Sequence, residues 1–335
     1  MLLFVTGAVA GLVMGFVLER GQLCFHATWS GLLAHHYGLA RAWLLGVMIG
    51  VVGLATIYSL DAWPQLNDGL AFRPARNIAG GLIIGVGMVI AVTCASGLFF
   101  KLGAGMLGAL VGVAGWTLGD GWVGAPVRDT ISDTTVLEGG SAATIPGWLG
   151  VNRWFVVVPV VAVVIGLLFG WRGASRDRPG RASQLAWPPT GVGLGVALVA
   201  GWALAGIGDG GFGPSTVGTV SRWVDGNPSW WIIGFVGFIV VGSAIAAGTS
   251  GATWVRGETL PRYAGLGLGG LLLGVGGQVG GGCNLGHGLS GVAQLNVSSW
   301  VVVASVIVGI AVTRAVWKTV ARSVPRPVEW GPAAS

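Results

Sequence analysis

The sequence is poor in charged residues. Only 9% of its 335 residues are Asp, Glu, Lys or Arg, and its lysines are Lys101 and Lys318 alone. Soluble domains carry about 25% charged residues, so this scarcity, with 53% hydrophobic residues, excludes an ordinary soluble domain. The net charge of +6 suggests no nucleic-acid partner, because the basic residues gather in the loops between apolar runs.

Several motifs are also missing. The three cysteines form no CxxC, which excludes a zinc knuckle and a thioredoxin-type redox pair, so no metal or cofactor is indicated. No GxxxxGK[ST] motif is present, which argues against ATP hydrolysis. The apolar start, 1–18, lacks a preceding basic region, so we interpret it as a first membrane span and not as a signal peptide.

Glycine and tryptophan are abundant instead. The chain has 63 glycines without a G-X-Y period, and 17 tryptophans against 3 tyrosines. Glycine allows membrane helices to approach closely, and tryptophan favours the membrane interface. The composition therefore predicts a helical protein that crosses the membrane several times.

Nine apolar runs are long enough to cross a bilayer, which takes about 20 residues. They lie at 2–18, 39–60, 76–93, 104–119, 152–171, 190–208, 230–248, 263–281 and 297–317. The predicted fold is an all-α polytopic membrane protein. A linker rich in Arg, Pro and Ser, 172–189, divides it into two membrane halves, 1–171 and 190–335, within one membrane domain.

Loop charges predict the orientation. The linker carries four arginines and the C-terminal tail is also basic, so the positive-inside rule places both in the cytoplasm. The 120–150 loop is mainly acidic and is expected outside. Nine spans then put the N-terminus outside and the C-terminus inside, although Arg73 and Arg76 fall on the outer side, against the rule.

The three cysteines share one position of an internal repeat. GLVMGFVLERGQLC ends at Cys24, GLIIGVGMVIAVTC at Cys94 and GLLLGVGGQVGGGC at Cys283. A weaker fourth copy, FIVVGSAIAAGTSG, has Gly251 in that place. A single membrane cysteine is most simply a small packing residue. Three at one repeat position favour a functional role, with an inherited duplication as the remaining explanation.

Each cysteine is followed by a segment too short to span: FHATWSGLLAHH, ASGLFFKLG or NLGHGLSG. We expect short half-helices or re-entrant turns, which membranes tolerate only inside protein or beside a cavity, and which are typical of transporters. Helix N-termini and free N–H groups attract anions, and glycines allow a close approach. Because a thiol is a weak donor with a polarizable sulfur, the pattern predicts a path for a soft, sulfur-containing anion.

Four polar side chains beside the cysteines are further candidates for substrate contact, namely His26, His287, Ser96 and Asn284. The histidines could form a polar wall that tunes the site, or could simply be hydrogen-bonded in the packing. Ser96 and Asn284 could donate to the ligand or cap their loops.

The cysteine segments resemble the YeeE/YedE family of sulfur-transport membrane proteins. The resemblance is carried by ERGQLCFHATWSG around Cys24, VTCASGLFFKLGAG around Cys94 and GGGCNLGHGLSG around Cys283, and it extends over nearly the whole chain. It implies a thiosulfate-type transporter of the bacterial inner membrane, in which these cysteines line a central pathway and pass the anion by thiol contacts. It also implies a small cytoplasmic sulfur-carrier protein as a partner, which we expect on a separate chain.

Two alternatives remain open at this point. A membrane thiol enzyme could relay sulfur through a cysteine persulfide, which requires one cysteine of unusual reactivity. A channel for a small neutral solute could use the same repeats and half-helices without needing thiols. No oxyanion donor or third orienting group can be assigned for Cys–His catalysis, so we expect a transporter and not an enzyme.

Overall fold

The computed structural model describes residues 1–170, 184–253 and 255–321, and these ranges contain helices and no β-strand. In chain order the helices are α1 (Leu2–Gly21), α2 (Phe25–Leu33), α3 (Gly38–Ser59), α4 (Pro74–Ala91), α5 (Ala95–Gly103), α6 (Gly108–Leu118), η1 (Gly119–Val123), α7 (Gly124–Asp129), η2 (Ser141–Ala143), α8 (Ile145–Leu149), α9 (Trp154–Gly170), α10 (Trp187–Ile207), α11 (Ser221–Val224), α12 (Trp230–Thr249), α13 (Leu260–Gly280), η4 (Gly286–Gly291) and α14 (Val297–Ala321). The all-α polytopic class is therefore confirmed.

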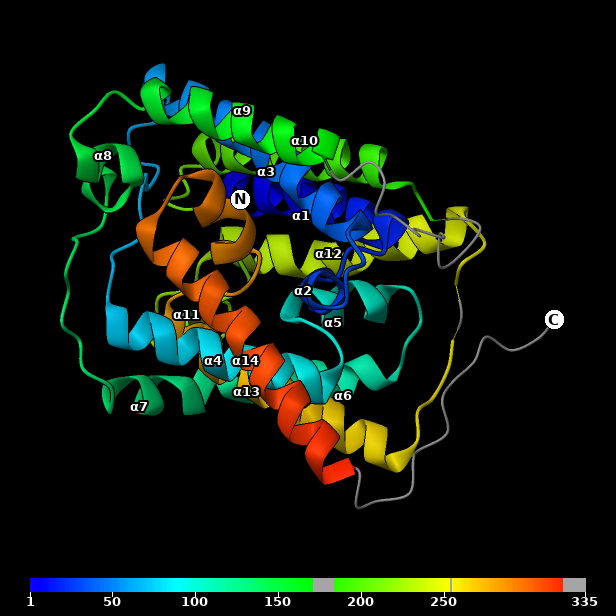
Figure 1. Cartoon of the computed structure of the whole chain (residues 1–335). Coiled ribbons are helices and arrows are strands. Elements are labelled where there is room, and N and C mark those ends of the chain that lie inside the picture. Colours follow the sequence, from blue (N-terminus) through cyan, green and yellow to red (C-terminus); the bar gives the residue numbers. More distant parts are fainter. Residues whose placement is uncertain (171–183, 254, 322–335) are drawn as a thin grey trace.

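The long helices form two bundles that lie side by side (Figure 1). The first contains α1, α3, α9, α10 and α12, and the second contains α4, α6, α7, α13 and α14. The short helices α2 and α5 lie between them. Each bundle takes helices from both sides of the predicted linker. Of that linker, 172–183 lies outside the described residues, and α10 begins within the remainder, at Trp187.

Glycines set the spacing of the first bundle. Gly7, Gly11 and Gly15 recur every fourth residue on one face of α1, and a methyl group at any of them would collide with the backbone of α12. At Gly11 the collision is with the carbonyl of Phe235. Successive glycines meet successive turns of α12, so the two helices run parallel. This small-xxx-small packing is a recurrent solution for helices in lipid.

The helices that end at the cysteines run in opposite directions. Gly80 of α4 meets Gly280 of α13, and Gly87 meets Gly269, so α4 and α13 are antiparallel. We call the end at which α4 begins and α13 ends the loop face, because the 119–153 segment lies there. The opposite end, where α9 ends and α10 begins, is the linker face.

Six segments of the described residues contain helices long and apolar enough to cross a membrane. They are Leu2–Leu33, Gly38–Ser59, Pro74–Gly103, Trp187–Ile207, Trp230–Thr249 and Val297–Thr319. The predicted number of nine is not confirmed. The 104–119 run is a short α6 that continues through η1 into α7. The α9 helix is apolar but shorter, and α13 is rich in glycine and packed between α4 and α6.

Candidate functional site: two thiol stations in the membrane interior

A left-handed residue ends the helix before each cysteine. It is Gln22 (φ 49°), Val92 (φ 49°) or Gly281 (φ 78°), and it lies two residues before the cysteine in every copy. A non-glycine residue rarely adopts this conformation, so its recurrence shows that the sequence repeat is also a repeat of backbone geometry. The weaker copy differs, because its left-handed residue is Gly251 itself (φ 65°).

Two of the thiols meet. Cys24 and Cys94 are the N-cap residues of α2 and α5, and their Sγ atoms are 3.5 Å apart. The Cys94 sulfur also lies 3.3 Å from the Ser96 hydroxyl and accepts the N–H of Gly97 at 3.3 Å. Thr93 Oγ1 lies 3.7 Å from Cys24 Sγ. These groups form a compact buried cluster that we call the paired-thiol station.

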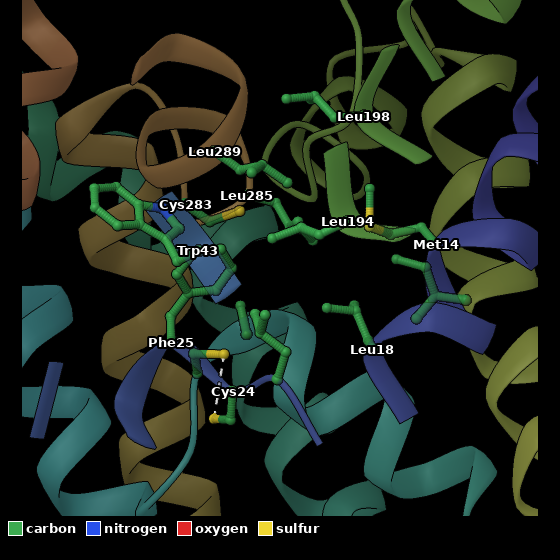
Figure 2. Close-up of a cluster of buried hydrophobic side chains, with 14 of the residues drawn as sticks. Met14, Leu18, Cys24, Phe25, Trp43, Leu194, Leu198, Cys283, Leu285 and Leu289 are labelled. Carbon is green, nitrogen blue, oxygen red and sulfur yellow. Dashed lines mark hydrogen bonds between the residues drawn. The ribbon is translucent and has the colours of Figure 1, made fainter. Parts of the chain in front are cut away.

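The third thiol has a different partner. Cys283 follows α13, and its sulfur accepts a hydrogen bond from the Thr216 hydroxyl at 3.0 Å. Both residues are buried. Figure 2 shows the Cys283 sulfur apart from the Cys24 pair, with Phe25 and Leu285 among the apolar side chains nearby. We call Cys283 with Thr216 the single-thiol station.

A buried carboxylate holds the segment that carries Thr216. Asp120 is fully buried, and its two oxygens accept the backbone N–H groups of Gly218, Val220 and Ser221. Gln278 donates to the same carboxylate at 2.7 Å. Asp120 lies in η1, a π-helical turn, and such turns are frequent at functional sites. The predicted outer loop at 120–150 is therefore wrong at its start, where the chain stays helical to Asp129 and buries Asp120.

Two indoles brace the turn after Cys283. Trp43 Nε1 donates to the carbonyl of Gly288 at 2.6 Å, and Trp29 Nε1 donates to Asn284 Oδ1 at 3.2 Å. The two rings pack edge to face, 4.9 Å between centroids. Asn284 thus serves to fix the turn, and its amide nitrogen reaches the sulfur of Met88.

Apolar side chains pack around the turns that carry the stations. Phe25 is buried, and a methyl group on Gly288 would lie 3.6 Å from its ring, so the ring rests against the turn that follows Cys283. Leu285 and Met88 are fully buried in the same cluster. We call these three side chains the septum (Figure 2 shows Phe25 and Leu285).

The single-thiol station lies beneath a basic vestibule at the loop face. Two adjoining cavities of about 310 and 440 Å³ share Val217 and Gly281 in their walls, next to Thr216 and Cys283. Three arginines line the first cavity and one lines the second. They are Arg73, Arg76 and Arg128 in the first, and Arg222 in the second.

Ion pairs explain why arginines occur on this face. Arg73 and Arg76 both contact the carboxylate of Asp133, at 3.1 and 2.6 Å. Arg128 contacts Asp129 at 3.0 Å, and its guanidinium holds the pKa of that exposed carboxyl below its ordinary value. The acidic loop therefore offsets part of the arginine charge.

The predicted polar residues differ in whether they contact a thiol. Ser96 touches a thiol, whereas both ring nitrogens of His287 are engaged within the protein, by Ser299 Oγ and the Gly280 carbonyl at 2.9 Å each. His26 is half-buried and pairs with Ser30 at 3.3 Å. His287 does, however, contribute to the wall of the first cavity.

Sequence reasoning missed three contributors. Thr93 directly precedes Cys94, and this position in the sequence could have identified it as a candidate. Thr216 lies in a segment of Gly, Pro, Ser and Thr whose spacing carries no signal, and Asp120 was interpreted as a loop residue.

Broken helices that end at buried polar groups, with an arginine-lined cavity near one of them, are typical of polytopic membrane transporters. The paired station lies at the end of α4 and the single station at the end of α13, and these two helices are antiparallel.

Comparisons with known proteins identify the family to which the chain belongs. A family model described as sulphur transport matches residues 20–312. A protein of Spirochaeta thermophila named thiosulfate transporter TsuA is 30% identical, over 88% of this chain and 93% of its own length. The Escherichia coli protein of the same name is 24% identical, over 92% of this chain and 93% of its own length. The chain belongs to the sulphur transport family, which confirms the predicted resemblance and agrees with a transporter, not an enzyme.

Proposed function

We propose that this chain takes up thiosulfate or a similar small sulfur-containing anion across the bacterial inner membrane. The path runs from the vestibule at the loop face, past Cys283, through the septum, and past Cys94 and Cys24 to the linker face. The observation that carries the proposal is the placement of all three thiols at two buried stations, one of them near two cavities lined by four arginines. The choice of thiosulfate as the substrate rests on the two relatives that are named thiosulfate transporters.

The chemistry of the two stations suits this cargo. An arginine-lined mouth concentrates anions, and a neutral solute would gain nothing from it. Deeper in, thiol and hydroxyl groups bind weakly enough to release the anion, as transport requires. The loop face is then outside, with the N-terminus, and the linker face is cytoplasmic, where a separate sulfur-carrier protein would receive the anion.

The test is thiosulfate uptake by a bacterial strain that lacks its other routes of sulfur import. Wild-type protein should restore growth on thiosulfate, and Cys24→Ala, Cys94→Ala and Cys283→Ala should each reduce uptake. Urea should not compete. Normal thiosulfate-dependent growth with all three single variants would contradict the pathway.

A further inference from the structure

Helix α13 ends in the wall of the first, arginine-lined cavity of the vestibule. The wall includes Gly280, the last residue of the helix, and Gly281, the left-handed residue that follows it. The last four carbonyls of an α-helix have no partner within the helix, and together they act like about half a negative charge. A negative helix end beside the path of an anion opposes the arginines unless other groups cover it.

Two side-chain donors cover the carbonyl of Gly280. Asn77 Nδ2 donates to this oxygen at 2.9 Å, and His287 Nε2 lies 2.9 Å from the same oxygen. Because a carbonyl only accepts, His287 Nε2 carries the hydrogen, and Nδ1 of the neutral ring accepts from the Ser299 hydroxyl at 2.9 Å. Asn77 and His287 are both buried, and both line the first cavity. The helix end is thus covered by donors where it meets the cavity.

Helix packing fixes Asn77 in this place. A methyl group on Gly80 would collide with the backbone of Gly280, so the first turns of α4 lie directly on the end of α13. Asn77 lies one turn before Gly80, on the same face of α4. Its Oδ1 accepts the N–H of Arg73, the N-cap residue of α4, at 2.8 Å, which leaves the amide nitrogen to face Gly280. One amide therefore serves a donor at one helix end and an acceptor at the other.

The charges in the cavity wall show why this cover matters. The described residues that line the cavity include three arginines and no carboxylate. Negative potential within the wall therefore comes from backbone carbonyls, among which those at the end of α13 are aligned. The carbonyl of Gly277, one turn before the helix end, already accepts the N–H of Gly282 at 2.9 Å. The hydrogens of Asn77 and His287 do the same for Gly280 and reduce the field that its oxygen sends into the cavity.

We propose that Asn77 is a positioning residue for the transported anion. Together with His287 it covers the carbonyl of Gly280, so that the arginines, and not the negative end of α13, set the potential that the anion meets in the first cavity. Without this cover the anion faces an uncompensated carbonyl. The inference rests on the proposed function and assigns a role to a residue that belongs to neither thiol station.

Thiosulfate uptake through the loop face tests this role, because it yields both a half-saturating concentration and a maximal rate per folded transporter. Asn77→Leu changes neither charge nor approximate size, and it removes the donor from Gly280. The half-saturating concentration should rise about three- to tenfold, the size of effect that a helix end has on a charge beside it. The maximal rate should stay close to that of wild type, because the covered carbonyl acts on binding in the vestibule.

Two variants of His287 act on the same carbonyl from the other side. His287→Phe keeps a flat ring without a donor, so the half-saturating concentration should rise, and this holds as a test even if Asn77→Leu does not fold. His287→Gln places an amide nitrogen near the position of Nε2 and should keep most of the affinity.

Ser299→Ala is the control for a purely structural effect. It removes the hydroxyl that supports His287 and leaves both donors on Gly280 in place. It should lower the melting temperature and leave the half-saturating concentration unchanged.

The outcomes separate the role of Asn77 from the proposed function. A folded Asn77→Leu protein with the half-saturating concentration of wild type overturns the inference, as does an unchanged value in His287→Phe where Asn77→Leu does not fold. A lower maximal rate at an unchanged half-saturating concentration, or an equal rise in Ser299→Ala, also overturns it, because a general structural effect then explains the result. All these results leave the proposed function standing. Absence of thiosulfate uptake by the wild type overturns the proposed function, and the role of Asn77 with it.

Discussion

Replacing Asp120 by asparagine is expected to destabilise the protein and to disturb the single-thiol station. The carboxylate is fully buried and accepts three backbone N–H groups of the 218–221 segment and the amide of Gln278. Two of these bonds go to each oxygen. An asparagine keeps one oxygen and replaces the other by an NH₂ group. That group cannot accept the hydrogen bonds of the two donors it faces.

The magnitude follows from those two lost bonds. A hydrogen bond to a charged group contributes about 1.5–3 kcal/mol, and a buried donor left without an acceptor costs about 1–3 kcal/mol. The segment can relax in part, so we expect Asp120→Asn to lower the free energy of unfolding by about 3–5 kcal/mol. Because Thr216 is anchored by the same segment, its contact with Cys283 should loosen too.

Thermal unfolding in detergent measures the first effect, and thiosulfate uptake measures the second. Asp225→Asn is the matched control, because Asp225 lies just after this segment and is exposed. It should melt and transport as wild type. If Asp120→Asn also melts and transports as wild type, the carboxylate does not organise the Cys283 site, and the reasoning fails.

Three further predictions concern single contacts. Thr216→Val should raise the half-saturating thiosulfate concentration about three- to tenfold through the lost bond to Cys283, with little effect on melting; an unchanged value would contradict a substrate role. Asp133→Asn removes the carboxylate that pairs with Arg73 and Arg76, so the arginine charge in the vestibule is no longer offset and the half-saturating thiosulfate concentration at low salt should fall. This effect should fade above about 0.15 M salt, and its absence at low salt would contradict the role of the vestibule. Trp43→Phe loses the 2.6 Å bond to Gly288 and should lower the melting temperature while raising turnover; lower turnover at unchanged stability would refute this.

The fold class and the repeat could be predicted because both follow from local sequence patterns. Long apolar runs indicate helices in lipid, and the shared spacing before Cys24, Cys94 and Cys283 corresponds to a shared backbone turn. What spacing cannot show is which copies meet. Cys24 and Cys94 touch because α2 and α5 lie between the bundles, whereas Cys283 is bonded to a residue of a different loop.

The residues that sequence reasoning missed act through long-range contacts. Asp120 looks like a loop acid, since only the fold brings the N–H groups of 218–221 to it. His287 stays a predicted site residue, whose ring nitrogens are both engaged by neighbouring protein groups and which lines the first cavity. Proximity to a cysteine in sequence identified Ser96, which touches a thiol, but could not identify Thr216, which lies on another segment.

The septum explains how the two stations can be coupled. Phe25 directly follows Cys24, and Leu285 lies two residues after Cys283, so each thiol turn carries part of its own barrier. Phe25 lies against Gly288, and α2 packs on both α3 of the first bundle and α14 of the second. The Trp43 bond to Gly288 joins α3 of the first bundle to the turn after Cys283. If the proposed path opens by a shift of α3 against this turn, Trp43→Phe should raise turnover, and that result would identify the shift as the slow step.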